Sequence, residues 1–347
     1  MNLYYISRNY KASNNAASKP KTDCESVMAD YGFKNLGFQQ TTHPSSAIGA
    51  IISFLGITKG LLRLPMKSTL GMQYPLSKFY AYKTSIAKFK KCKIILIVHD
   101  VKSLMGKTEN IKKEIKKFSK ADVLIVHNER MHKWFVDNGY KGKLVNLDLF
   151  DYLPTQNLKA TSLAIEDKTH EIVFAGGLGK EKSEFIYKMD NFIDRNFKLK
   201  LYGNGFDKGL INQENSVIDY QGVFTPDQVV NEIEGTFGLV WNGNSTEECS
   251  GHFGKYLLYN NPHKTSLYIL CGLPIIVWKK AAIANFIERE KLGITINALE
   301  ELDEKLRNLS TVEYQEIKAN IEKTKEKMIL GGFLKTALKK SIDTLNQ

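Results

Sequence analysis

The sequence predicts two consecutive α/β domains, each built on a parallel, doubly wound sheet with helices on both faces. Short apolar runs alternate with longer amphipathic segments, which is the pattern of strands and helices in such a sheet. The runs KIILIV and DVLIV have almost no polar alternation, so both faces of those strands should be covered. The same alternation begins again after about residue 165, and 347 residues are enough for two domains with separate cores.

The first half of the chain accounts for one of these sheets. We expect its strands over residues 3–6, 35–38, 70–73, 93–98 and 122–126. Its helices are predicted over residues 22–31, 45–63, 76–91, 108–119 and 128–138. These elements form an N-terminal domain of residues 1–165, which ends in the polar linker 154–170.

The second half repeats the arrangement. EIVFAGG is a strand that enters a glycine-rich turn, and the further strands are expected over residues 198–202, 217–220, 237–241, 274–278 and 294–296. Helices are predicted over residues 181–193, 226–233, 263–271, 280–291 and 311–328. The result is a C-terminal domain of residues 166–330. Residues 331–347 follow as a last helix that could pack back on the N-terminal domain.

The composition predicts a globular protein without a membrane-spanning segment. Hydrophobic residues make up 43% of the chain, and no run reaches the roughly 18 apolar residues that cross a bilayer. The first residues lack the basic start and long apolar core of a secretory signal, so we expect a cytoplasmic protein. Cys24, Cys92, Cys249 and Cys271 are scattered without a CxxC pair, which predicts reduced thiols.

Positive charge is concentrated in the first half of the chain. Residues 1–165 carry 26 Lys and Arg against 11 Asp and Glu, whereas residues 166–347 carry 23 against 26. Within the first half, residues 78–120 hold 13 basic and 3 acidic side chains. Such a field of one sign predicts an anionic partner, for which nucleic acid, anionic lipid and pyrophosphate all qualify. The alternative is a lysine-rich surface that is only solvated.

The turn AGGLGKEKSEF is the first motif with chemical meaning. A strand ends at Gly176 and Gly177 and a helix begins soon after, so backbone N–H groups and a helix N-terminus can approach a phosphate. Lys180 and Lys182 add positive charge there. The motif is neither a Walker A loop nor a GxGxxG fingerprint, and an ordinary turn stays open as the alternative.

The second motif is the long polar segment WNGNSTEECSGHFGKYLLYNNPHKTSLYILCGLPIIVW, which joins two predicted strands. Pro262 is placed to start a helix, whose first turn then holds His263, Lys264 and Ser266. Free N–H groups and a lysine together suit a diphosphate. The alternative is a capped surface helix with a solvated lysine, which a loop so crowded with Asn, His and Lys disfavours.

Two aspartates are the predicted general bases. In IVHDV, His99 and Asp100 follow a buried strand, and a carboxylate at a strand's carboxyl end can face a ligand. In NNAASKPKTDCE, Lys19 and Asp23 lie on the loop that leads into the first helix. Each aspartate could instead cap a helix, and Asp100 could pair with a lysine.

A metal site is not predicted. The sequence has no DxD triplet, and its histidines show neither HxxxH nor HxH spacing. Two doubly wound domains bring the carboxyl ends of their strands to a cleft between them, and ligands bind at those ends. The cleft is therefore the expected site.

The motifs together resemble a known family. FGLVWNGNSTEECSGHFGKYLLYNNPHKTSLYILCGLPIIVWKKAAIANFI resembles the C-terminal half of bacterial β-1,6-galactofuranosyltransferases of O-antigen synthesis. KIILIVHDVKSLMG, KADVLIVHNERM, KLVNLDLFDYL and IVFAGGLGKEKSEFIY continue the match. More distantly, the chain is similar to the glucosyltransferases that modify streptococcal serine-rich adhesins. The resemblance covers nearly the whole chain.

The resemblance implies a GT-B fold, in which two Rossmann-like domains face a cleft, and a UDP-sugar donor with no metal or other cofactor. It implies that Lys182 and Lys264 contact the nucleotide diphosphate. The surrounding nucleotide-sugar pocket is expected to comprise Gly176, Gly177, Tyr202, Glu247, Asn260, Asn261, His263 and Ser266. The acceptor is expected in the N-terminal domain, near Lys19 and His99.

The resemblance also implies an inverting hexosyltransferase of surface polysaccharide (O-antigen or capsule) synthesis. We expect UDP-galactofuranose as donor, a lipid-linked oligosaccharide as acceptor, and Asp100 or, second, Asp23 as base. One alternative is a UDP-glucose-dependent glucosyltransferase that acts on a glycoprotein or glycan. Another, suggested by charge alone, is a nucleic-acid-binding protein, although no nucleic-acid-reading motif is present.

Two segments of the first half also suit peripheral binding at the inner face of the cell membrane. The basic segment 78–120 can attract anionic lipid, and segment 45–63 is apolar with cationic residues near its end. The alternative is a core helix beneath lysines that are only solvated. The oligomeric state stays open, with a homo-oligomer among the expected forms.

Overall fold

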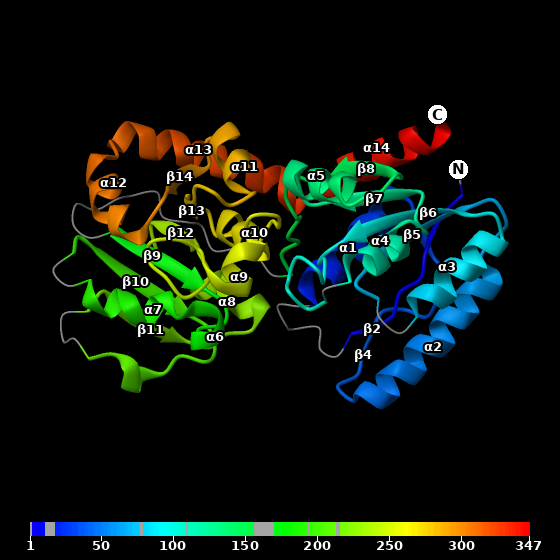
Figure 1. Ribbon diagram of the computed structural model, residues 1–347, viewed down its shortest axis with the longest axis horizontal. Helices are drawn as coiled ribbons and strands as arrows, with labels where there is room; N and C mark the ends of the chain where they lie inside the picture. Colours follow the sequence, from blue (N-terminus) through cyan, green and yellow to red (C-terminus); the bar gives the residue numbers. More distant parts are fainter. Residues whose placement is uncertain are drawn as a thin grey trace. The chain divides into compact units, whose positions relative to one another are not determined.

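The computed structural model describes residues 2–10, 18–76, 79–108, 110–155, 170–192, 195–212 and 216–347. Contacts divide the chain into a first unit, Met1–Leu153 with Leu330–Gln347, and a second unit, Pro154–Ile329. Each unit contains a six-stranded sheet (Figure 1). The domain boundary predicted between residues 165 and 166 lies outside the described residues.

The sheet of the first unit is parallel throughout. Its order is β3 (Lys34–Asn35), β1 (Leu3–Tyr5), β5 (Thr69–Tyr74), β6 (Lys93–Val98), β7 (Val123–Val126) and β8 (Lys143–Asn146). The two apolar runs form β6 and β7 in the middle of the sheet, as their lack of alternation predicts. The strand predicted over 35–38 is wrong beyond Asn35, because only two exposed residues pair there. Strand β8 was not predicted.

Helices accompany this sheet, and most lie where the periodicity predicts. They are α1 (Lys19–Tyr31), α2 (Ser46–Arg63), α3 (Tyr80–Phe89), α4 (Ile111–Phe118), α5 (Glu129–Asp137) and α14 (Gly332–Asn346). A separate short pair joins β2 (Asn9–Tyr10) to β4 (Thr41–Thr42), which the sequence did not indicate. Helix α1 begins three residues earlier than predicted, and this changes the position of Asp23.

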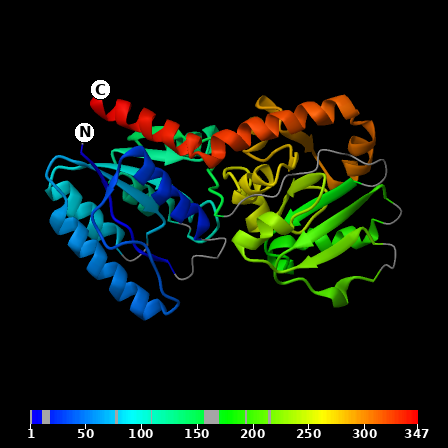
Figure 2. The ribbon, with the colours of Figure 1, turned by 180° about the vertical axis from the view of Figure 1, so that it is seen from behind.

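The C-terminal helix α14 belongs to the first unit, where it contacts α1, β7 and β8 (Figure 2). Asp151 fixes its start. The two carboxylate oxygens of Asp151 accept hydrogen bonds from the backbone N–H groups of Phe333 and Leu334, at 3.1 and 2.7 Å. The first N–H groups of a helix have no partner within the helix, so this buried carboxylate satisfies two of them.

We expect Asp151→Ala to lower the free energy of unfolding by about 1–3 kcal/mol, because two buried N–H groups lose their acceptor. Urea denaturation measures the change. Asp151→Asn is the matched control, since it keeps one acceptor oxygen and should lose less. Equal stability of Asp151→Ala and the unsubstituted protein would contradict this role of the carboxylate.

The sheet of the second unit is also parallel. Its order is β11 (Ile218–Gly222), β10 (Phe197–Tyr202), β9 (His170–Ala175), β12 (Phe237–Val240), β13 (Ile275–Trp278) and β14 (Gly293–Ile296). The chain runs outward from β9 to β11, then returns to the other side of β9 with β12. The carboxyl ends of β9 and β12 therefore flank the switch point of the sheet, which is where doubly wound folds bind ligands.

The second unit has several short helices. They are α6 (Lys180–Ser183), α7 (Phe185–Lys188), η1 (Met189–Asn191), η2 (Lys208–Leu210), α8 (Pro226–Glu232), α9 (Gly251–Tyr256), α10 (His263–Leu270), α11 (Ala284–Arg289), η3 (Leu299–Glu301), α12 (Leu302–Asn308) and α13 (Thr311–Ile329).

The single helix predicted over 181–193 is wrong. The N–H of Phe185 donates to Gly243 and the N–H of Gly243 donates to Lys182, and these bonds to the loop after β12 interrupt the helical pattern. The polar segment after β12, expected as a loop, contains α9. The helix predicted over 280–291 begins only at Ala284.

Candidate functional site

The turn after β9 is held by close backbone contacts. Gly176 has a φ of 149°, and its carbonyl oxygen would lie 1.8 Å from a Cβ atom on Gly203. Residue 203 must therefore lack a side chain. The N–H of Gly176 donates to the carbonyl of Tyr202 at 2.9 Å, and Ser183 Oγ donates to the carbonyl of Gly177 at 2.8 Å. These bonds fix the turn between the end of β10 and the start of α6.

Tyr268 fixes α10 beside the same switch point. Its ring occupies the space over Gly238, where a Cβ atom would lie 2.2 Å from the ring. Its hydroxyl accepts from the N–H of Ala175 at 2.8 Å and donates to the carbonyl of Leu239 at 3.2 Å. Ala175 ends β9 and Leu239 lies in β12, so one side chain attaches α10 to both strands that flank the switch point.

Two lysine side chains lie over the glycine turn. The ammonium nitrogen of Lys264, from the first turn of α10, would be 3.8 Å from a Cβ atom on Gly176. Lys182 Cδ would be 3.7 Å from a Cβ atom on Gly177. Glycine at both positions leaves room for a ligand to approach the backbone between these side chains. These distances place the two lysine side chains near the glycine turn, and their binding of a diphosphate stays a prediction.

The environment of Lys264 is poor in negative charge. Its Nζ lies 3.7 Å from the centre of the Phe174 ring and donates a long hydrogen bond of 3.5 Å to Asn242 Oδ1. Among the described residues it forms no ion pair. Burial lowers the pKa of Lys264 well below the ordinary lysine value, and the nearby charge of Lys182 lowers it further. Two mutually repelling ammonium groups at a switch point suit a multivalent anion.

The start of α10 carries further polar groups. Pro262 is the N-cap residue, as its lack of an N–H allows, and its side chain forms no capping bond. Asn260 Oδ1 and Thr265 Oγ1 are buried and have no hydrogen-bond partner among the described residues. Buried polar atoms are normally paired, so these two atoms are exceptions close in sequence to Lys264.

The structure does not bring every predicted residue to the lysine pair. The hydroxyl of Tyr202 accepts from the N–H of Glu234 at 3.3 Å, so its side chain belongs to the packing behind the turn. Glu247 is exposed on the loop before α9. Asn261 and Ser266 are buried, and His263 is half-buried.

The first unit has a pocket at its own switch point, between β1 and β5. It is lined by apolar side chains and by Tyr5, Arg8, Tyr10, Glu25, Gln73 and Lys83. The buried Glu25 carboxylate accepts from Ser7 Oγ at 2.5 Å and from the Tyr10 hydroxyl at 2.7 Å. Burial raises the pKa of Glu25 and lowers the pKa of Lys83 to about 8. The pocket thus has groups that can bind hydroxyls and exchange protons.

His99 and Asp100 directly follow β6, the buried strand that IVHDV predicts. His99 Nε2 donates to Gln73 Oε1 at 2.6 Å, and Gln73 Nε2 donates to the carbonyl of Lys21 at 3.0 Å. Burial and the charge of Arg8 lower the pKa of Lys21, whereas the negative charge of Asp100 opposes that shift. Asp100 is half-buried.

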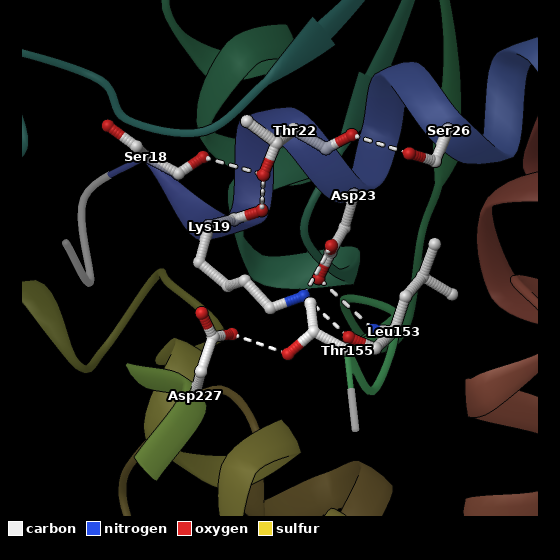
Figure 3. A network of polar contacts seen from close by, with 8 residues as sticks. All are labelled: Ser18, Lys19, Thr22, Asp23, Ser26, Leu153, Thr155 and Asp227. Carbon is white, nitrogen blue, oxygen red and sulfur yellow. Dashed lines mark hydrogen bonds and ion pairs between the residues drawn. The ribbon is translucent and has the colours of Figure 1, made fainter. Parts of the chain in front are cut away.

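The position predicted for Asp23 needs correction. Lys19 and Asp23 do not lie on a loop, and Asp23 does not cap a helix, because α1 already begins at Lys19. Lys19 Nζ binds Asp23 Oδ1 at 2.5 Å and the carbonyl of Leu153 at 2.6 Å, while Asp23 Oδ2 accepts from the N–H of Leu153 at 3.1 Å (Figure 3). Both carboxylate oxygens are therefore held in a buried ion pair.

Sequence reasoning missed Glu25, Lys83, Arg8 and Asn242. Glu25 and Lys83 lie in helices far apart in the sequence, and only the folded sheet brings them to one pocket. A signal was present for Arg8, which lies in the segment after the first strand, where this kind of sheet usually binds its ligand. Asn242 likewise follows β12.

Comparison with known proteins identifies the family. Models of the two domains of the glucosyltransferase 3-like family match the chain in order, the N-terminal one over residues 3–149 and the C-terminal one over residues 172–341. The β-1,6-galactofuranosyltransferase WbbI of Escherichia coli (strain K12) is 28% identical over 99% of each chain. Glucosyltransferase 3 of Streptococcus parasanguinis is 25% identical over 99% of this chain and 98% of that protein.

Solved structures show the same architecture. The apo form of the lipopolysaccharide outer core galactosyltransferase WaaB has a TM-score of 0.59 at 12% identity, covering 98% of this chain and 100% of that chain. WaaG, a glycosyltransferase involved in lipopolysaccharide biosynthesis, has a TM-score of 0.54 at 11% identity, covering 96% and 98%. The predicted GT-B fold is confirmed. The chain belongs to the glucosyltransferase 3-like family and is a glycosyltransferase.

Proposed function

We propose that this enzyme transfers galactofuranose from UDP-galactofuranose to a lipid-linked oligosaccharide during synthesis of a surface polysaccharide such as O-antigen or capsule. The support for the sugar is the similarity to a β-1,6-galactofuranosyltransferase along 99% of both chains. The support for the nucleotide is the site itself. The proposal places the enzyme in the cytoplasm, where nucleotide sugars are made, and its acceptor at the inner face of the membrane.

The main support for the proposal is that the side chains of Lys182 and Lys264 both lie near the turn formed by Gly176 and Gly177. A diphosphate brings two negatively charged groups into a small volume, and it would relieve the repulsion between the two ammonium groups. The dipole of α10 favours negative charge at the start of the helix, where Lys264 lies. Asn260 and Thr265 then supply polar atoms for the rest of the nucleotide sugar.

In the proposed reaction the acceptor hydroxyl attacks the anomeric carbon of the donor sugar and inverts its configuration. The bond from that carbon to the β-phosphate oxygen breaks, and UDP leaves with both electrons. A carboxylate takes the proton of the hydroxyl. Charge grows on the departing diphosphate, so Lys182 and Lys264 stabilise the transition state more than the ground state.

We assign the base to Asp100 rather than Asp23. Both oxygens of Asp23 are held by Lys19 and Leu153, and protonation of that carboxylate would break a buried ion pair. Asp100 is half-buried and follows His99, which is hydrogen-bonded to Gln73 in the pocket that also contains Arg8. That pocket is the proposed acceptor site, with His99 held in place by Gln73.

We expect the reaction to proceed in excess EDTA, since lysines and helix N–H groups would take the place of a divalent ion at the diphosphate. UDP release, measured with a coupled assay, should be unchanged by the chelator. A metal-dependent glycosyltransferase whose metal can be removed serves as the control for chelation. Loss of turnover with EDTA that manganese restores would refute the lysine mechanism.

Glucosyl transfer is the second candidate, and it rests on the glucosyltransferase 3 relatives. The two candidates share the diphosphate site and differ only in the sugar and acceptor. Turnover with UDP-glucose on a glycoprotein acceptor, without turnover of UDP-galactofuranose, would favour the second.

A further inference from the structure

Helix α2 carries a row of exposed apolar side chains. Ile48, Ile51, Leu55 and Leu62 are 48, 59, 52 and 77% exposed. Their spacing of three, four and seven residues places them along one face of the helix. We call these four residues the α2 face. Large apolar side chains that gather in a row on a surface indicate a contact partner.

The opposite face of α2 is fixed to the first unit through small residues. A Cβ atom on Gly60 would lie 2.8 Å from Ile6, and one on Gly49 would lie 2.5 Å from Asn9. The helix also packs beside α3 (Figures 1 and 2). By length and composition α2 could cross a membrane, contrary to the sequence-based expectation, and 33% of it is buried. Its contacts along the unit favour a helix that lies on a surface.

Apolar and basic side chains gather at the end of α2. Lys90, which follows α3, donates to the carbonyls of Leu62 and Leu64 at 3.0 and 2.7 Å and so joins the ends of the two helices. Met66 and Phe89 beside this junction are 62 and 82% exposed. The exposed basic residues near it, which we call the basic end, are Arg63, Lys67, Lys88 and Lys91.

The surrounding sequence has charge of one sign only. Between Asp30 and Asp100 the chain has no Asp or Glu and ten Lys or Arg. Two copies of such a surface would repel each other, which disfavours self-association through it. Nucleic acid would neutralise the charge but leave the apolar row in water. An anionic bilayer offers negative head groups and an apolar layer beneath them, so it satisfies both features.

We propose that the α2 face and the basic end form a docking surface for an anionic lipid bilayer. The apolar row enters the boundary of the acyl layer while the basic residues contact the head groups. This holds the first unit at the leaflet, and, if the proposed function is right, next to its lipid-linked acceptor. That last step rests on the proposed function, whereas bilayer binding itself does not.

Co-sedimentation with vesicles tests the proposal. We expect the protein to sediment with phosphatidylglycerol-containing vesicles at low salt, to bind phosphatidylcholine vesicles far more weakly, and to be released largely by high salt. Absence of binding to anionic vesicles at low salt would overturn the proposal.

Two sets of variants locate the surface. Lys67→Gln, Lys88→Gln and Lys91→Gln combined should weaken binding about 100-fold, at about 1 kcal/mol for each charge. The matched control removes the exposed lysines Lys279, Lys305 and Lys323 of the second unit, and it should bind nearly normally.

A second variant tests whether the α2 face contributes to vesicle binding. Ile51→Asn with Leu62→Asn should weaken binding at least tenfold, because two large side chains no longer enter the bilayer. Val312→Asn, at a position 79% exposed in α13, is the control. The proposal would be overturned if the lysine variant and the apolar variant both bound vesicles as tightly as the unsubstituted protein. It would also be overturned if the protein did not bind vesicles and light scattering showed that these variants changed its oligomeric state.

UDP affinity is measured on the same samples. Intact UDP binding without vesicle binding refutes only this inference, and vesicle binding without UDP binding refutes only the proposed function.

Discussion

Replacing Asp100 by asparagine should reduce turnover by roughly 100-fold or more while UDP affinity stays near normal. Asparagine keeps the shape and hydrogen-bonding capacity of the side chain, but it cannot take the proton of the acceptor hydroxyl. Asp100 is half-buried after β6, and its neighbour His99 is hydrogen-bonded to Gln73, which lines the pocket of the first unit. Because the proposed nucleotide site lies in the second unit, the substitution should not disturb it.

Initial rates under saturating donor, together with calorimetric titration of UDP, measure the two effects separately. Asp23→Asn is an informative comparison, since Asp23 is held by Lys19 and should affect stability more than turnover. Glu25→Gln tests the carboxylate that lines the pocket, whose pKa is raised by burial. Near-normal turnover of Asp100→Asn with loss in Glu25→Gln would reassign the base.

Lys264→Ala should weaken UDP binding by about 1.5–3 kcal/mol, the usual range for a hydrogen bond to a charged group. The half-buried ammonium group lies over the Gly176 turn, and the diphosphate would supply the negative charge that its surroundings lack. Lys255→Ala, an exposed lysine on α9, is the matched control and should leave affinity unchanged. Equal UDP affinity of Lys264→Ala and the unsubstituted enzyme would remove Lys264 from the site.

The same lysine predicts a pH dependence. Burial and Lys182 lower the pKa of Lys264 in the free enzyme, and a bound diphosphate would raise it again. As the pH rises through the lowered pKa, the free enzyme loses the proton that binding requires, so UDP affinity should fall. Lys264→Arg keeps its charge at these pH values and should show a flatter profile. A flat profile in the unsubstituted enzyme would contradict the assignment.

The sequence predicted those parts of the fold whose signals are local. KIILIV forms β6 at its predicted residues, and Pro262 precedes α10 as its chemistry requires. The prediction was wrong where hydrogen bonds to backbone groups far away in the sequence determine the structure. The helix expected over 181–193 is broken by hydrogen bonds to Gly243, a contact that no local pattern reveals.

The same difference between local and distant signals applies to the candidate site. The glycine turn with Lys182 and the helix start with Lys264 were each recognised from local residues, and the family resemblance placed them at one diphosphate. The depressed pKa of Lys264 could not be predicted, since it depends on burial and on another lysine 82 positions away. The ion pair that holds Asp23 forms within α1, yet it was missed because the start of the helix was placed after Lys19.

The most direct test of the account is a donor competition followed by mass spectrometry. Equal amounts of UDP-galactofuranose, labelled with ¹³C in the sugar, and unlabelled UDP-glucose are offered together with a lipid-linked oligosaccharide acceptor. We expect the acceptor to gain one labelled hexose. The Lys264→Ala variant should form the same product more slowly at limiting donor. A product with only unlabelled hexose, or no product from either donor, would contradict it.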